Sequence, residues 1–179
     1  MTITEYTQMK AFARQDGFFL GLMWCATFAC FAYSTDYPEL SLLYIAGVVA
    51  TPVLLFMRLR NYRHNAADTG CVSFLRSYAY LLVTTCCAAL VLTIGVYAYF
   101  RFVDNGRFMT IMIQSVGNAE VRKSLAEAGM DIGTLDSQLS AMAQMRPVDV
   151  AFSVFSNTLI MSAMMNAVIA LIGKGRSSK

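Results

Sequence analysis

Four arginines flank one polar connection in an otherwise apolar chain. Arg58, Arg60 and Arg63 precede the connection, and Arg76 follows it. A guanidinium group offers five N–H donors in a planar fork that suits phosphate and carboxylate groups. Basic residues beside apolar segments also attract anionic lipid, by about 1 kcal/mol for each residue near the surface. The four arginines are therefore candidate contacts for a lipid headgroup or for a membrane partner.

Groups that could act in catalysis or hold a metal are sparse. The only histidine, His64, lies in the same basic connection, where a solvated side chain is a simpler interpretation than a base paired with Cys71. The other cysteines fall in apolar runs, as inert thiols do: Cys25, Cys30, Cys86 and Cys87. No Asp, Glu, Lys or His lies in the middle of an apolar run. We expect no catalytic residue, no metal and no cofactor.

Neutral polar side chains do occur inside the apolar runs, most densely in the last one. Asn157, Ser162 and Asn166 are the candidates for contacts between helices. Such groups usually hydrogen-bond across membrane helices and contribute about 0.6 to 2 kcal/mol each. A polar groove for a lipid headgroup is the alternative, and the sequence leaves both open.

The elements that carry these residues are predicted from hydropathy. Hydrophobic residues make up 57% of the 179 residues and charged ones 14%, against about 45–50% and about 25% in soluble domains. About 20 apolar residues cross a bilayer as a helix. The sequence predicts an all-α polytopic membrane protein, a single domain with four transmembrane helices, at residues 17–35, 40–57, 74–103 and 148–173.

The net charge of +3 is too small, and the basic residues too scattered, for a nucleic-acid surface. Pro52 should loosen the second helix one turn before the arginines.

The distribution of charge predicts the orientation, because Lys and Arg accumulate on the cytoplasmic side. One side carries nine basic residues: Lys10, Arg14, Arg58, Arg60, Arg63, Arg76, Lys174, Arg176 and Lys179. The acidic residues on that side are Glu5, Asp16 and Asp68, whereas the other side carries five basic and eight acidic residues. Both termini should therefore be cytoplasmic, with residues 104–146 outside.

That outer segment is predicted to be a helical insertion in the form of a hairpin. Gly129 suits the left-handed position that ends one helix, and Asp131 or Thr134 can cap the next. Pro147 suits the first turn of the last span. One apolar stripe of the second arm is a candidate outer interaction face: Leu135, Leu139 and Met142. It could cover the other arm, the membrane surface, a second protein chain or a lipid.

Two segments resemble a known family. MRLRNYRHNAADTGCVSFLRSYAY follows the second span, and LAEAGMDIGTLDSQLSAMAQM precedes the last. The matching positions are Arg60, Tyr62, Arg63, Gly70, Val72, Ser73 and Phe74 in the first, and Ala128, Gly129, Met130, Asp131 and Met142–Met145 in the second. The chain resembles a family of small Bacteroidota inner-membrane proteins catalogued as domain of unknown function 4199. The resemblance implies a bacterial inner-membrane location and no assigned activity. It also implies a candidate partner, a polyprenyl-phosphate glycosyltransferase.

These observations lead to two expectations about function. The first is a non-catalytic accessory or scaffold subunit that binds a membrane partner. The alternative is a small lipid or amphiphile transporter or lipid-binding protein, with membrane lipids and, in a homo-oligomer, further copies of the chain as its partners. A membrane enzyme ranks third, because the apolar runs have no Asp, Glu, Lys or His at their centres.

Overall fold

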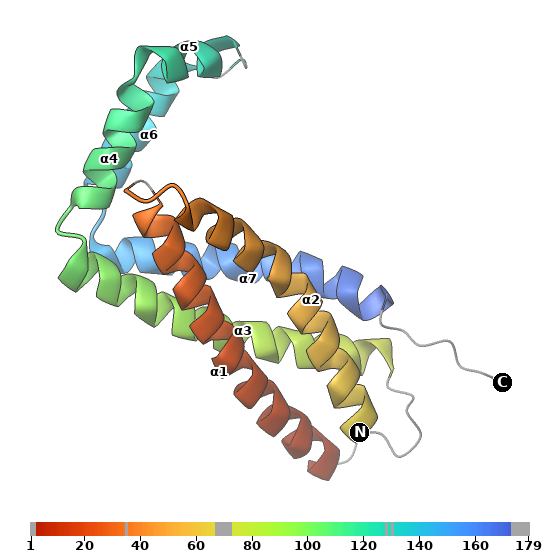
Figure 1. The fold of residues 1–179 in the computed structure, drawn as a ribbon. Coiled ribbons are helices and arrows are strands. Elements are labelled where there is room, and N and C mark those ends of the chain that lie inside the picture. The colour runs from red at the N-terminus through yellow and green to blue at the C-terminus, as the bar shows by residue number, and fades with distance from the viewer. Residues whose placement is uncertain (1–2, 35, 67–72, 128, 130, 173–179) are drawn as a thin grey trace.

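Four long helices form a bundle, and three short helices form an arm that projects from one end of it (Figure 1). The structure, a computed structural model, describes residues 3–34, 36–66, 73–127, 129 and 131–172, and every regular element within these ranges is a helix. The bundle consists of α1 (Ile3–Tyr33), α2 (Leu40–Ala66), α3 (Phe74–Ala98) with its π-helical continuation η1 (Tyr99–Val103), and α7 (Pro147–Ile172). The arm consists of α4 (Arg107–Gly117), α5 (Ala119–Glu127) and α6 (Ile132–Ala143).

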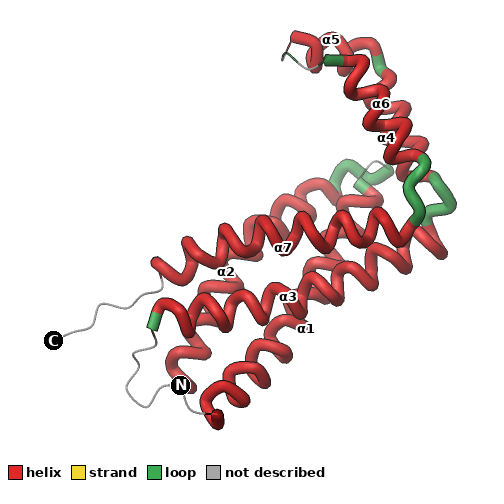
Figure 2. The backbone as a smooth tube through the Cα atoms, turned by 180° about the vertical axis from the view of Figure 1, so that it is seen from behind, coloured by secondary structure: helices red, strands yellow, loops and turns green. Residues whose placement is uncertain are grey.

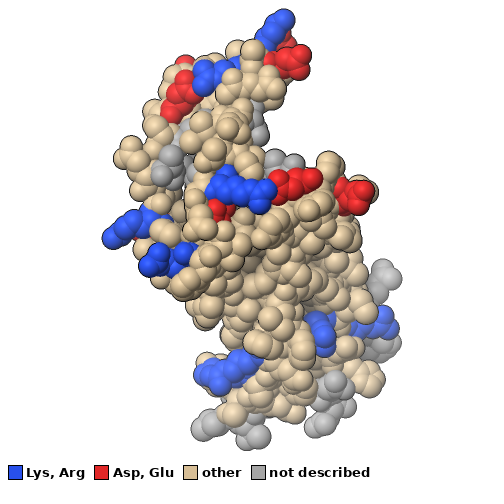
Figure 3. All heavy atoms as spheres, turned by 60° about the vertical axis from the view of Figure 1, so that its left-hand side comes forward, with Lys and Arg blue, Asp and Glu red and all other residues tan. Residues whose placement is uncertain are grey.

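All four bundle helices are long and apolar enough to cross a membrane: Tyr6–Tyr33, Leu40–His64, Phe74–Val103 and Pro147–Ile172. Their outward faces are apolar, as in Leu42, Ile94 and Phe152, which are 71%, 69% and 67% exposed. A broad zone of the face in Figure 3 has no charged side chain, between charges near the arm and basic groups at the opposite end. Because water would disfavour such a surface and hydrocarbon would not, the chain is a multi-pass membrane protein. The predicted all-α fold with four spans is confirmed.

Two helices extend beyond the predicted spans. The first helix begins at Ile3 rather than at residue 17, and the second continues to Ala66 rather than ending at residue 57. Many residues in these polar extensions have a high helix propensity. Long basic side chains can also extend to the headgroup layer while their backbone stays helical. Asp16 therefore lies inside a span, and Arg58, Arg60 and Arg63 lie in a helix rather than in a connection. Cys71 and residue 173, the predicted end of the last span, lie outside the described residues.

The bundle is held together mainly through α3, which packs between α1 and α7 (Figure 2). Small residues allow α1 and α3 to approach closely: a Cβ added at Gly17 would lie 2.5 Å from the carbonyl oxygen of Thr84. By contrast, α2 packs along α1 and contacts α3 and α7 only sparsely. Helix α2 is therefore only loosely packed against both α3 and α7.

The arm leaves the bundle along α4 and α5 and returns along α6, which lies beside α4 in both ribbon views (Figures 1 and 2). Asn118 is extended and its side chain accepts a 3.1 Å hydrogen bond from the Glu120 amide, so the first arm of the hairpin is divided into α4 and α5. Gly129 has a φ of 82°, as predicted for its C′ position. Asp131 caps α6 by accepting a 3.3 Å hydrogen bond from the Thr134 amide. The side chains of Leu139 and Met142 lie outside the described part, and Leu135 is partly buried.

Candidate functional site

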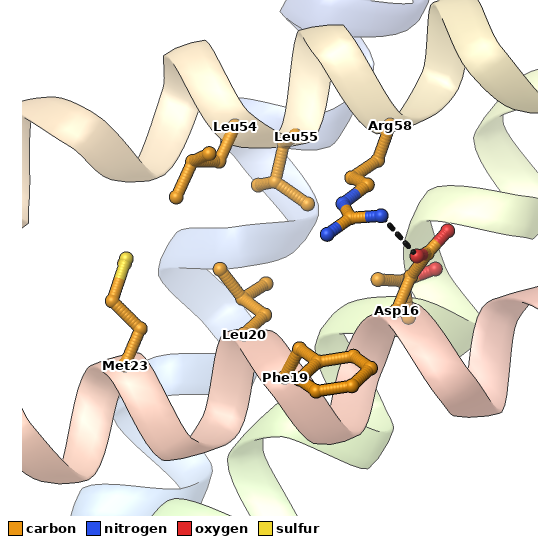
Figure 4. A pocket seen from close by; sticks show the side chains of 8 residues that line it. Asp16, Phe19, Leu20, Met23, Leu54, Leu55 and Arg58 are labelled. Carbon is orange, nitrogen blue, oxygen red and sulfur yellow. Dashed lines mark ion pairs between the residues drawn. The ribbon is translucent and has the colours of Figure 1, made fainter.

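A charged side chain lies among the helices near the end of the bundle where α1 begins and α7 finishes, the terminal end. Asp16 on α1 forms an ion pair with Arg58 on α2, with 3.1 Å between Oδ1 and Nη1 (Figure 4). The other carboxylate oxygen accepts a hydrogen bond from the hydroxyl of Tyr80 on α3. The Asp16 side chain is 13% exposed and Tyr80 is fully buried. One carboxylate thus joins three helices.

Stacked tyrosines extend this network toward the other arginines. Tyr62 on α2 stacks on Tyr80 with 4.3 Å between ring centroids and 3° between planes. The Tyr62 hydroxyl accepts a 3.1 Å hydrogen bond from Arg76 Nε. Arg63 donates to Ser77 Oγ from Nε at 3.2 Å and from Nη2 at 2.7 Å. These contacts connect the last turns of α2 to the first turns of α3.

Of the four predicted arginines, Arg58 and Arg76 therefore belong to one network, Arg63 binds Ser77 nearby, and Arg60 is exposed on α2. Sequence reasoning missed Asp16, which it placed in the polar flank before the first span. A usable signal was present, because Ala13, Gly17 and Leu20 are small or apolar residues at helical spacing around it. The structure buries all three. That spacing already indicated that the helix, and its packed face, begins before residue 17.

A cavity of about 220 Å³ lies next to the Asp16–Arg58 ion pair, between α1 and α2. We call it the Arg58 cavity. Asp16, Arg58 and Thr84 form its polar end, and the remaining walls are apolar: Phe19, Leu20, Met23, Leu54 and Leu55. It lies beside the turn after Pro52, where the sequence indicated a loosened helix. The cavity is amphipathic, with its charge at one end.

A larger groove of about 540 Å³ lies in the half of the bundle nearest the arm. It follows the loose seam between α2 and α7, with α1 and α3 behind it. The lining residues are Trp24, Thr27, Phe28, Phe31, Tyr44, Val48, Thr51, Leu92, Asn157, Thr158, Met161, Ser162 and Met165. We call it the α2–α7 groove. Trp24 Nε1 donates a 3.1 Å hydrogen bond to Thr51 Oγ1 and so fixes the indole at the groove wall.

The three predicted polar residues of α7 occupy different environments. Asn157 is exposed and lines the groove, and Ser162 is buried at the groove wall. Asn166 is fully buried and donates from Nδ2 to Thr85 Oγ1 on α3 at 3.0 Å. Its Oδ1 has no hydrogen-bond partner among the described residues. Asn166 therefore connects α7 to α3, whereas Asn157 faces an open space.

Both hollows fall within a segment that matches a known family. A family model described as protein of unknown function (DUF4199) matches residues 15–174. The chain belongs to the DUF4199 family. No curated protein and no solved structure matches it. In this DUF4199 member every lining residue of the Arg58 cavity and of the α2–α7 groove lies within the matched segment. The two hollows belong to the family domain and not to an extension of it.

Proposed function

We propose that this DUF4199 protein is a non-catalytic membrane protein that binds a lipid or another amphiphile within its helix bundle. The observation that carries the proposal is the α2–α7 groove, an apolar space of about 540 Å³ along the sparse contact between α2 and α7. Ligand sites are usually concave and apolar with a few polar groups that orient the ligand. Groups of that kind here are Thr27, Thr51, Asn157, Thr158 and Ser162.

The length of the groove favours an acyl chain over a partner helix. On α7 the lining runs from Asn157 to Met165, which at 1.5 Å per residue is about 12 Å. A transmembrane helix is about 10 Å wide and packs over much of the roughly 30 Å hydrocarbon core. A flexible chain needs only a short, narrow recess, so the groove is better suited to one arm of a lipid.

The exposed amide of Asn157 supports the same ligand class. An amide moved into hydrocarbon without a hydrogen-bond partner costs roughly 2–7 kcal/mol. An ester or hydroxyl group of an amphiphile in the groove would satisfy Asn157 there. A purely apolar ligand would not, which is why we propose an amphiphile.

The sole tryptophan, Trp24, gives a direct test because it lines the groove. Lipids with brominated acyl chains should quench its fluorescence in the full-length protein. Asn157→Phe should fill the groove and reduce the quenching. Ile160→Phe is the matched control, because Ile160 is 61% exposed on the same helix but does not line the groove. Equal quenching in wild type and N157F would mean that only the surrounding bilayer reaches Trp24, and the proposal would be abandoned.

An accessory subunit is the second candidate function, favoured by the arm. Helices α4 to α6 contact one another and project from the bundle, tied at the base by an ion pair between Arg107 and Asp36. A projecting helical element is suited to a partner protein, and a polyprenyl-phosphate glycosyltransferase is the candidate named by the family resemblance. Affinity purification in mild detergent should recover a stoichiometric companion that is lost when a short linker replaces residues 107–143. Recovery of the chain alone would count against this role.

Location in a bacterial inner membrane, with both termini cytoplasmic, belongs to the same proposal. The terminal end of the bundle carries the described side chains of Lys10, Arg14, Arg58, Arg60, Arg63 and Arg76. Basic residues beside spans are typical of the cytoplasmic side. Reporter fusions after residue 179 and within α5 should give opposite compartments, and the same compartment for both would overturn the orientation.

A further inference from the structure

We propose that Arg58 and the Arg58 cavity form a second lipid site, which binds the phosphate-bearing headgroup of an anionic phospholipid. It is separate from the α2–α7 groove, because the two hollows share no lining residue. It also lies on the side of the groove that faces the terminal end of the bundle.

The Arg58 guanidinium is held in a fixed orientation and is also accessible to a ligand. Its side chain is 47% exposed, and Nη1 is held 3.1 Å from Asp16 Oδ1. Asp16 is itself fixed by the Tyr80 hydroxyl. In Figure 4 the other terminal nitrogen of Arg58 points away from Asp16, toward the space between Leu20 and Leu55. A guanidinium has five N–H donors, so one ion pair leaves donors for a phosphate oxygen.

The other three predicted arginines are placed differently. Arg63 donates to Ser77, and Arg76 donates to Tyr62. Both are half-buried, and neither lines the cavity. Arg60 is exposed but also lies outside the cavity lining. Of these four arginines, Arg58 is thus the one with an exposed guanidinium that also lines an apolar cavity.

The charge around the cavity favours an anion. Among the side chains that the structure describes at the terminal end, Asp16 is the acidic one. The basic ones are Lys10, Arg14, Arg58, Arg60, Arg63 and Arg76. Asp16 offsets one of these charges and the remainder is positive. An anionic headgroup is therefore attracted to this end, and a neutral one is not.

The apolar walls identify a lipid rather than free phosphate as the source of the anion. Phe19, Leu20, Leu54 and Leu55 surround a space of about 220 Å³ beside the guanidinium. Bare phosphate gains nothing from these side chains, whereas the first part of an acyl chain buries apolar surface against them. The volume suits that part of a lipid, with the rest lying along the bundle surface.

The experiment uses the full-length protein in phosphatidylcholine nanodiscs, with binding of phosphatidylglycerol measured by native mass spectrometry. Arg58→Gln should lower the affinity for phosphatidylglycerol at least ten-fold, because it removes a charge-assisted hydrogen bond to the phosphate in addition to the general attraction of one basic residue, which alone accounts for about five-fold. Arg60→Gln is the matched control, because it removes the same charge two positions away and outside the cavity. Equal losses in R58Q and R60Q would show that surface charge alone attracts the lipid, and would overturn the site.

Two further arms keep the test decisive if R58Q does not fold. Leu54→Trp fills the cavity with every charge in place, and it should also lower the affinity for phosphatidylglycerol; unchanged binding overturns the site. Inorganic phosphate should not displace the lipid, and displacement would mean a simple anion site. The groove is tested separately, since R58Q should retain the quenching of Trp24 and N157F should retain the preference for phosphatidylglycerol.

Discussion

Replacing Gly17 with alanine tests how closely α1 and α3 must approach. A Cβ at Gly17 would lie 2.5 Å from the Thr84 carbonyl oxygen and 2.7 Å from Cys87 Cβ. Both neighbours belong to the backbone of α3 or are attached directly to it. The added methyl group can be accommodated only if the two helices separate or one of them shifts.

The magnitude follows from two opposing terms. Overpacking of a tight interface costs about 1–3 kcal/mol, and a clash with backbone belongs in the upper half of that range. Alanine regains about 1 kcal/mol relative to glycine in a helix. We therefore expect Gly17→Ala to lower the free energy of unfolding by about 1–2 kcal/mol.

Unfolding by dodecyl sulfate in mixed micelles, followed by circular dichroism, measures this change. Gly95→Ala is the matched control at the same helix pair. Its Cβ would meet Cys25 Sγ at 2.7 Å, and this terminal atom can rotate away. G95A should therefore be close to neutral. If G17A proves as stable as G95A, the close approach of the helices does not restrict residue 17, and the reasoning fails.

Two further predictions concern a buried amide and a helix cap. Asn166→Leu removes a hydrogen bond worth about 0.6–2 kcal/mol together with an unpaired buried oxygen that costs about 1–3 kcal/mol. The same dodecyl sulfate titration should give unchanged or higher stability. Thr85→Val should lower it by about 1–3 kcal/mol, because the Asn166 amide loses its acceptor, and the reverse order would contradict the assignment. Hydrogen bonds from Thr134 and Gly133 lower the pKa of Asp131 below the usual aspartate value of 3.8. Its contribution to α6 should be complete above pH 3.8 and be lost as the pH falls through that lowered pKa. Amide exchange at Thr134 should report the loss, and Asp131→Asn, which still caps but does not titrate, should show none.

Local signals predicted the parts of the fold that depend on a few neighbouring residues. Pro147 begins α7, Gly129 adopts a positive φ, and Asp131 caps α6. Each depends on the backbone preference or hydrogen-bonding reach of one side chain. The same approach failed at Asp16, because a hydropathy window registers its charge but not the partners that compensate it. The break at Asn118 between α4 and α5 was also missed, because one asparagine is a weak signal within a helix-compatible segment.

The sequence by itself determined the medium and the number of spans. A transmembrane helix is recognised from the summed hydropathy of about 20 adjacent residues. Four such apolar segments are unstable in water however they are arranged. Only the tertiary structure decided which polar groups meet. Asp16 and Tyr80 are 64 positions apart, and their contact depends on the rotation and crossing of α1 and α3. The α2–α7 groove likewise exists because α2 and α7 barely touch, and that spacing follows from how all four helices pack together.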